Sequence, residues 1–290
     1  MKQNGLIIGS LCAIGCEVLY GVSYIFTKQA TDNASVLSLL GWRFLLAFLV
    51  MSLFVVLGII KVNLKRKSLK PLLLVALFSP VIYFIGETIG ISNTTASESG
   101  IFLACIPVAS LIASTVILHK KPTRLQVTGI LITLGGVLVT VLAVGISSSF
   151  SITGYIFLMV AVVSYALYCV FVDKAPGYTG IEITYMMLVA GAAVFVILAF
   201  IEAAIGNDVK NLITLPIRNK DFRVAVLYQS LGCSVLAFFL SNVAIARIGV
   251  NRTSSFIGVA TVVSIIAGAL ILKEPVSYTH LRAHETSAHL

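Results

Sequence analysis

The chain contains nine apolar stretches, each long enough to cross a lipid bilayer as a helix. A spanning helix needs about 20 mainly apolar residues to cross a hydrocarbon core about 30 Å thick. The stretches cover residues 6–28, 35–60, 71–91, 96–118, 125–146, 153–172, 181–205, 222–245 and 253–272. Only 11% of the residues are charged, against about 25% in soluble domains. The sequence therefore predicts an all-α integral membrane protein, with the lipid bilayer as a partner.

The positive charges gather in the short loops between these stretches. A formal net charge of +9 raises the question of a nucleic-acid partner, but cations placed beside membrane spans argue against one. Lys and Arg in short loops mark the cytoplasmic side. The two richest loops hold Lys61, Lys65, Arg66, Lys67 and Lys70, and then Lys120, Lys121 and Arg124. We therefore predict a multi-pass protein of the cell membrane, the cytoplasmic membrane of a prokaryote, with its amino terminus in the cytoplasm. The charge bias is weaker in the second half, so this orientation depends on the first.

The two halves of the chain resemble each other in the order of their features. A shift of 153 residues sets Ile101 to Pro122 on Ser254 to Pro275, and both segments end a predicted span. Near the start of each half, Tyr20 aligns with Tyr165 at a shift of 145 residues. Because each half holds an odd number of spans, the second copy enters the membrane upside down. Inverted repeats of this kind are typical of transporters whose substrate site lies near the midplane.

A series of short motifs accompanies this duplication. They are Trp42-Arg43-Phe44-Leu45-Leu46-Ala47, Thr94-Thr95-Ala96-Ser97, Pro107, Gly129, Leu134-Gly135-Gly136-Val137-Leu138 and Lys273-Glu274-Pro275. Taken together and in this order, they make residues 6–275 similar to the EamA-type proteins of the drug/metabolite transporter superfamily. The resemblance implies ten helices in two inverted five-helix repeats that export small metabolites through a central cavity. One departure is Lys120-Lys121, where the family usually has Gly-Glu.

A second departure lies at the end of the chain, where a tenth apolar stretch is expected. We predict a first repeat over 1–146, a second over 147–275 that lacks its last helix, and a non-native tail over 276–290. The tail holds three of the four histidines, and His280 and His284 stand at the i, i+4 spacing of a metal site. Without other ligands or a folded surrounding, this spacing is weak evidence. We expect no metal and no cofactor.

Three ionisable residues fall inside predicted spans, where each charge costs about 2.5–3.5 kcal/mol to insert and therefore suggests a function. Glu17 and Arg43 come at a similar depth, about 12–13 Å from the outer boundary at 1.5 Å per residue. We predict that they form an ion pair that lines the cavity; the alternative is a pair that only fixes two helices. Glu87 shares a helix face with Tyr83 and would bind a cationic group or a proton, or extend toward the membrane surface.

Aromatic and amide side chains extend this candidate site. Tyr20 and Tyr24 share a face with Glu17, and Gln229 shares a face with Cys233 while Asn242 points elsewhere, so only one amide would face the cavity. The alternative for each aromatic residue is packing or interfacial anchoring. Pro107 should kink its helix and free a carbonyl, whereas Gly86 and Gly90 have the spacing of close helix packing. The predicted substrate-binding residues are Glu17, Tyr20, Tyr24, Trp42, Arg43, Tyr83, Glu87, Pro107, Tyr165, Tyr168 and Gln229.

These patterns favour a secondary transporter that exports a small organic metabolite, amino acid-like or drug-like, by alternating access. The chain has no phosphate-binding Gly-x-x-x-x-Gly-Lys-Ser/Thr segment, so ATP is not its expected energy source, whereas protons are a candidate. An enzyme is not expected, because the only histidine outside the tail is His119, at a membrane boundary. A lipid flippase, or a polytopic protein that transports nothing, stays open as an alternative. The sequence does not decide the substrate, the coupling or the oligomeric state.

Overall fold

A computed structural model describes residues 2–64, 67–119 and 151–272, together with positions 123–124, 127–129, 131–132 and 135. Within these ranges the chain is helical and contains no strand. Eight helices there are long and apolar enough to cross a membrane, and they correspond to eight of the nine predicted spans. Most of the fifth predicted span, 125–146, and the whole of 276–290 lie outside the described residues.

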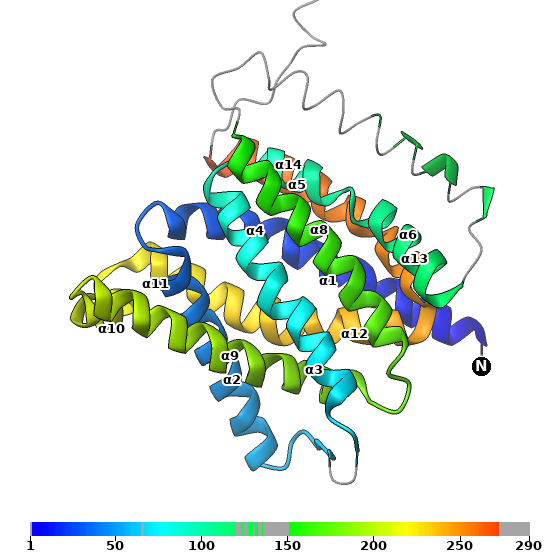
Figure 1. The fold of residues 1–290 in the computed structure, drawn as a ribbon, viewed down its shortest axis with the longest axis horizontal. Helices are drawn as coiled ribbons and strands as arrows, with labels where there is room; N and C mark the ends of the chain where they lie inside the picture. Colours follow the sequence, from blue (N-terminus) through cyan, green and yellow to red (C-terminus); the bar gives the residue numbers. More distant parts are fainter. Residues whose placement is uncertain are drawn as a thin grey trace, which may run out of the picture.

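The spans of the first half follow one another from the amino terminus (Figure 1). They are α1 (Lys2–Thr31), α2 (Val36–Val56), the composite α3 (Lys70–Ala76), η1 (Leu77–Ile82) and α4 (Tyr83–Ser92), and the composite α5 (Ala96–Leu103) and α6 (Ile106–Leu118). Hydroxyl side chains start several of these helices. Ser35 caps α2, and Thr95 forms a reciprocal capping box with Glu98 at the start of α5. Such caps satisfy backbone N–H groups that a helix leaves unpaired.

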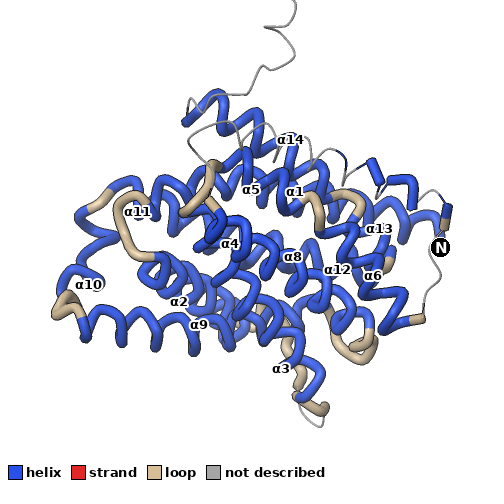
Figure 2. The backbone as a smooth tube through the Cα atoms, turned by 45° about the horizontal axis from the view of Figure 1, so that its top comes forward, coloured by secondary structure: helices blue, strands red, loops and turns tan. Residues whose placement is uncertain are grey.

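The second half repeats this order and adds one short helix. Its elements are α8 (Ile152–Asp173), α9 (Gly180–Ile205), α10 (Val209–Arg218), α11 (Lys220–Leu227), η2 (Tyr228–Ala237), α12 (Phe238–Ile248), α13 (Val250–Ser254), α14 (Ile257–Ala267) and η3 (Gly268–Leu272). Thr179 and Glu182 form a second capping box at the start of α9. Helix α10 is too short to span a membrane and lies at one end of the bundle (Figure 2).

The two halves are packed through each other. Helix α1 lies mainly against α12 and α14, and α8, its counterpart in the second half, lies mainly against α4 and α6. Helix α2 packs along α9, its own counterpart, as Figures 1 and 2 show. Each half therefore buries its first helix against the third and fourth spans of the other half. The interior where α1, α2, α4, α8 and η2 face one another is built from both halves.

The third and fourth spans are interrupted at matching places in the two halves. The third span of the first half is kinked within η1, where Ser79 has a non-helical backbone, and the third span of the second half contains a π-helical segment, η2. Each fourth span breaks after a short first helix, between α5 and α6 and between α13 and α14. Pro107 explains the first break, since it has no N–H to donate and stands in the first turn of α6. π-helical turns inside α-helices are common at functional sites.

Close packing of α4 on α8 depends on the two glycines that the sequence marked for helix contact. A Cβ atom on Gly86 would lie 2.7 Å from the Phe157 carbonyl oxygen, and one on Gly90 would lie 2.6 Å from Leu158. Both distances are shorter than real side chains tolerate. The predicted packing role of Gly86 and Gly90 is therefore confirmed.

Gly86→Ala should destabilise the protein, because the two helices must move apart to admit the methyl group. Overpacking of this kind costs about 1–3 kcal/mol. The midpoint of thermal unfolding in detergent measures it. Gly258→Ala is the matched control, since nothing lies within 4 Å of a Cβ at Gly258. Equal midpoints for the two variants would show that α4 and α8 are not tightly packed.

Candidate functional site

The interior shared by the two halves holds a set of buried polar side chains, here called the central polar cluster. It comprises Glu17 of α1, Arg43 of α2, Tyr83 and Glu87 of α4, Tyr165 and Tyr168 of α8, and Gln229, Ser234 and Asn242 of the eighth predicted span. The side chains of Glu17, Arg43 and Glu87 are 3%, 1% and 2% exposed. Ionisable groups this deep in a membrane bundle are costly, so their presence suggests a function.

Arg43 is the centre of the first hydrogen-bond network. Its Nε donates to Ser234 Oγ at 2.8 Å, and its Nη1 donates to Gln229 Oε1 at 3.2 Å. Its guanidinium carbon lies 4.1 Å from the centre of the Phe84 ring, a cation–π contact. Gln229 in turn donates to Thr27 Oγ1 of α1 at 2.8 Å. Arg43 Nη2 is buried and has no hydrogen-bond partner in the described part of the chain.

The predicted ion pair between Glu17 and Arg43 is wrong. The described residues contain one ion pair, which joins Lys67 to Glu182. Depth along a helix, counted in residues, does not fix which neighbour a side chain meets. Helix α1 packs mainly on α12 and α14, and Arg43 turns instead toward η2 and Phe84. Within the described ranges, Glu17 forms no ion pair.

Glu87 and Tyr83 lie on one helix face, as their spacing predicts, and are bonded to each other. Tyr83 donates its hydroxyl to Glu87 Oε1 at 2.6 Å. The Arg43 charge interacts with Glu87, although the two groups are too far apart for an ion pair. The ring of Tyr83 also packs against Tyr165, with centroids 5.4 Å apart. These contacts place Glu87 inside the cluster rather than at the membrane surface.

The tyrosines of α1 and α8 surround the same interior. Tyr20 and Tyr24 are 6% and 3% exposed, on the same side of α1 as Glu17. Tyr165 and Tyr168 of α8 are 5% and 1% exposed, and their ring centroids lie 5.3 Å apart. The buried tyrosine hydroxyls supply donors and acceptors to an otherwise apolar core.

Asn242 belongs to the cluster, although the sequence pattern placed it on another face. Tyr168 donates to Asn242 Oδ1 at 2.7 Å, and Asn242 Nδ2 donates to Thr184 Oγ1 at 2.9 Å. In a regular α-helix, the side chain at position 242 is rotated by about 220° from the one at position 229, so the two lie on different faces. The π-helical segment η2 lies between them, and its wider turns rotate Asn242 inward. Both amides are therefore buried, which corrects the expectation that only one faces the interior.

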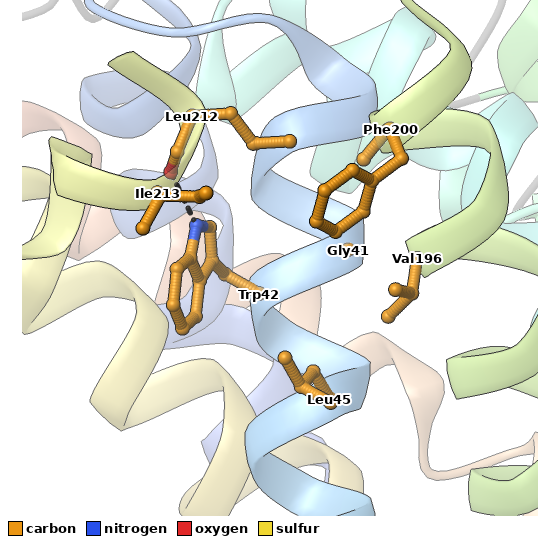
Figure 3. Close-up of a pocket in the computed structure, with 8 residues that line it drawn as sticks. Gly41, Trp42, Leu45, Val196, Phe200, Leu212 and Ile213 are labelled. Carbon is orange, nitrogen blue, oxygen red and sulfur yellow. Dashed lines mark hydrogen bonds between the residues drawn. The ribbon is translucent and has the colours of Figure 1, made fainter. Parts of the chain in front are cut away.

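Trp42 and Pro107 lie away from this cluster. Trp42 is half-buried and donates its indole N–H to the Leu212 carbonyl of α10 at 2.9 Å, in an apolar groove at the periphery (Figure 3). The expectation that Trp42 lines the central cavity is thus wrong. Its side chain contacts α10 instead, a short helix that sequence periodicity does not distinguish from a loop. Pro107 is half-buried in the first turn of α6, and its predicted kink appears as the break before that helix.

No three His, Cys, Asp or Glu side chains among the described residues come close enough to hold a metal ion. The five cysteines are free thiols, and four of them are buried. The cluster therefore offers hydrogen bonds and charges, from Arg43, Glu17 and Glu87, for recognising a small polar molecule.

Tyr168→Phe should lower the stability of the folded protein, because the Asn242 carbonyl loses its donor in a buried site. An unsatisfied buried group costs about 1–3 kcal/mol. Thermal unfolding in detergent measures the change. Tyr185→Phe is the control, since the Tyr185 hydroxyl is half-buried and 3.4 Å from Ser52 Oγ. If the two variants lose the same amount of stability, the Tyr168–Asn242 hydrogen bond contributes no more than the Tyr185–Ser52 contact.

Comparison with known proteins places this architecture in a family. Residues 7–142 and 152–283 each match the model of the EamA-like transporter family. Two proteins of Bacillus subtilis (strain 168) are similar over most of their length. Uncharacterized transporter YcxC is 29% identical over 273 residues, covering 93% of this chain and 87% of the relative, and Uncharacterized transporter YetK is 26% identical, covering 96% and 83%.

A protein of known crystal structure has the same fold. It superimposes with a TM-score of 0.61 at 14% identity, covering 90% of this chain and 89% of that chain. The eight apolar spans, the two copies of the family domain and the transporter relatives agree with one another. The chain is a multi-pass membrane protein that belongs to the EamA-like transporter family.

Proposed function

We propose that this protein is a secondary transporter that exports a small organic metabolite, amino acid-like or drug-like, by alternating access. The observation that carries the proposal is the central polar cluster, which lies where the two family domains meet and is buried from both ends. Inverted repeats typically rock against each other around a site at their interface. A buried polar cluster at that interface is the expected chemistry of such a site.

Two groups of the cluster have unused binding capacity. Arg43 Nη2 has no partner in the described chain and would donate to an anionic or carbonyl oxygen of the substrate. The Glu17 carboxyl has no ion-pair partner there and would bind a cationic group or a proton. A substrate that bonds to both groups would offset the cost of burying them. The proposed substrate site therefore combines Arg43, Glu17, Glu87 and the surrounding tyrosines.

Contacts between the two halves close the bundle at both ends. At the end predicted to be cytoplasmic, Lys67 Nζ bonds to both oxygens of Glu182, at 2.9 and 2.8 Å, and the Tyr178 hydroxyl donates to the Ser68 carbonyl. At the opposite end, Ser35 donates to Glu202. Alternating access requires these two sets of contacts to break in turn. We propose that the amino terminus is cytoplasmic, which makes the Lys67–Glu182 pair the inner contact.

Transport, rather than catalysis, is the activity proposed. The buried Cys16, Cys169 and Cys233 have no histidine beside them among the described residues, so they lack the usual base that activates a thiol. The proposed coupling is to protons, through Glu17 or Glu87. If an imposed pH gradient does not change the flux, this coupling is excluded, although the protein is still a transporter.

Glu17→Gln and Arg43→Lys should each reduce flux at least about tenfold, because each removes a buried charge contact worth about 1.5–3 kcal/mol. Everted membrane vesicles from an overexpressing strain, offered a panel of labelled amino acids and cationic dyes, measure the flux. Lys174→Gln, on an exposed side chain, is the control for expression and insertion. Undiminished flux in both variants, at equal protein in the membrane, would remove the cluster from the transport site.

Reversing the charges of Lys67 and Glu182 should test the inner contact. Lys67→Glu alone places two carboxylates together and should slow flux several-fold, because the end facing Glu182 cannot close. The double variant with Glu182→Lys should recover part of the loss, although Glu182 also caps α9. Vesicle flux measured over a range of salt concentrations tests the contribution of charge, which salt screens only in part because Glu182 is buried and Lys67 is 32% exposed. Flux that is identical in all three variants would mean that this ion pair has no part in the cycle.

A further inference from the structure

An apolar groove opens on the outside of the bundle, away from the central polar cluster. It encloses about 120 Å³ between α2, α9 and α10. Its lining residues are Gly41, Trp42, Leu45, Val196, Ala199, Phe200, Leu212 and Ile213. Figure 3 shows Trp42 along one wall and Phe200 and Val196 along the other, with the indole N–H bonded to the Leu212 carbonyl. That bond satisfies the polar atom of Trp42, and all the lining side chains are otherwise apolar.

The groove lies just inside one membrane boundary. Gly41 comes five residues after the start of α2, and Phe200 comes five residues before the end of α9. At 1.5 Å per residue, both positions are about 7–8 Å below the helix ends. This depth corresponds to the outermost part of the hydrocarbon core, where the acyl chains of lipids begin. An apolar groove at this depth faces lipid and not water.

Helix α10 covers the groove and has the pattern of a helix that lies in the membrane interface. Leu212 and Leu215 are buried against the bundle, whereas Ile213 and Ile217 are 51% and 76% exposed. Lys210 lies on the same helix face as the two exposed isoleucines, because positions three and seven residues apart share a face. An amphipathic helix with apolar residues toward lipid and basic residues above them binds anionic lipid surfaces.

Three exposed cations belong to α10, which lines the groove, and to α11, which follows it. Lys210 and Arg218 belong to α10, and Lys220 begins α11. None of the three forms an ion pair among the described residues. Asp221 adjoins Lys220 in the first turn of α11, and Glu202 and Asp208 line a separate hollow, where Glu202 accepts from Ser35 and Asp208 accepts from Asn211. The cations therefore have charge available for an anion on the lipid side.

We propose that this groove is a binding site for an anionic phospholipid. One acyl chain occupies the space between α2, α9 and α10, and the phosphate lies among Lys210, Arg218 and Lys220. Interfacial Lys and Arg side chains attract anionic lipid, and burial of the acyl CH₂ groups adds to the binding. The bound lipid holds α10 against α2 and α9. The proposed lipid site does not depend on which substrate the protein transports.

The test compares two lipids that differ only in charge. Purified full-length protein in detergent is titrated with phosphatidylglycerol or with phosphatidylcholine of the same acyl chains, and the midpoint of thermal unfolding is recorded. Phosphatidylglycerol should raise the midpoint by several degrees more than phosphatidylcholine, with saturation and with loss of the difference at high salt. Equal stabilisation by the two lipids would overturn the proposal.

Variants of the groove and of its cations complete the test. Val196→Phe, which fills the groove, and the double variant Lys210→Gln/Arg218→Gln should each abolish most of the preference for phosphatidylglycerol. Leu53→Phe, on an exposed apolar position, and Lys61→Gln/Lys174→Gln, at the opposite boundary, are the matched controls and should keep the preference. If the first pair keeps it too, the lipid is a general annular lipid and the proposal fails.

A second measurement uses the wild-type protein, so its result does not depend on whether the variants fold. Native mass spectrometry of the wild-type protein, released from mixed micelles that contain both lipids in equal amounts, counts the lipid molecules retained. At least one retained phosphatidylglycerol, without an equal share of phosphatidylcholine, supports the site. Retention in proportion to the mixture contradicts it.

Discussion

The burial of Arg43 inside an apolar bundle is the constraint on which the rest of this structure depends. A guanidinium in the hydrocarbon region is tolerated only where protein groups replace its water, and Ser234, Gln229 and the Phe84 ring do so here. Those partners come from both halves of the chain. The need to solvate one cation thus ties α2 and α4 of the first half to η2 of the second, at the interface around which transporters of this kind move.

Interruptions in the helices place the other polar groups in that interface. The π-helical segment η2 brings Gln229 and Asn242 to one side, so that a single span reaches both Arg43 and Tyr168. The first half has a backbone kink at Ser79, within η1, just before Tyr83 and Glu87. Irregular backbone inside a membrane is expected only where protein or a polar cavity surrounds it. The third span of each half is therefore interrupted next to polar residues of the cluster, although by different backbone geometry.

Much of the fold could be predicted from the sequence, because the length and hydropathy of a span depend on local composition alone. Eight predicted spans, the buried positions of Glu17 and Glu87, and the packing role of Gly86 and Gly90 all follow from such local patterns. The pairing of Arg43 could not, since it depends on which helices meet across the repeats. The roles of Trp42 and Asn242 were also missed, one because α10 is short and the other because no sequence signal marks η2.

The central claim is that the buried cluster becomes accessible from both sides of the membrane in turn. Cys233 gives a natural probe, since it is fully buried in η2 next to Ser234. In a variant that keeps only this cysteine, a membrane-impermeant maleimide is applied to right-side-out and to inside-out vesicles, and the labelled fraction is followed over time. The account predicts slow labelling from both sides. Labelling from one side only, or from neither, would contradict alternating access at this site.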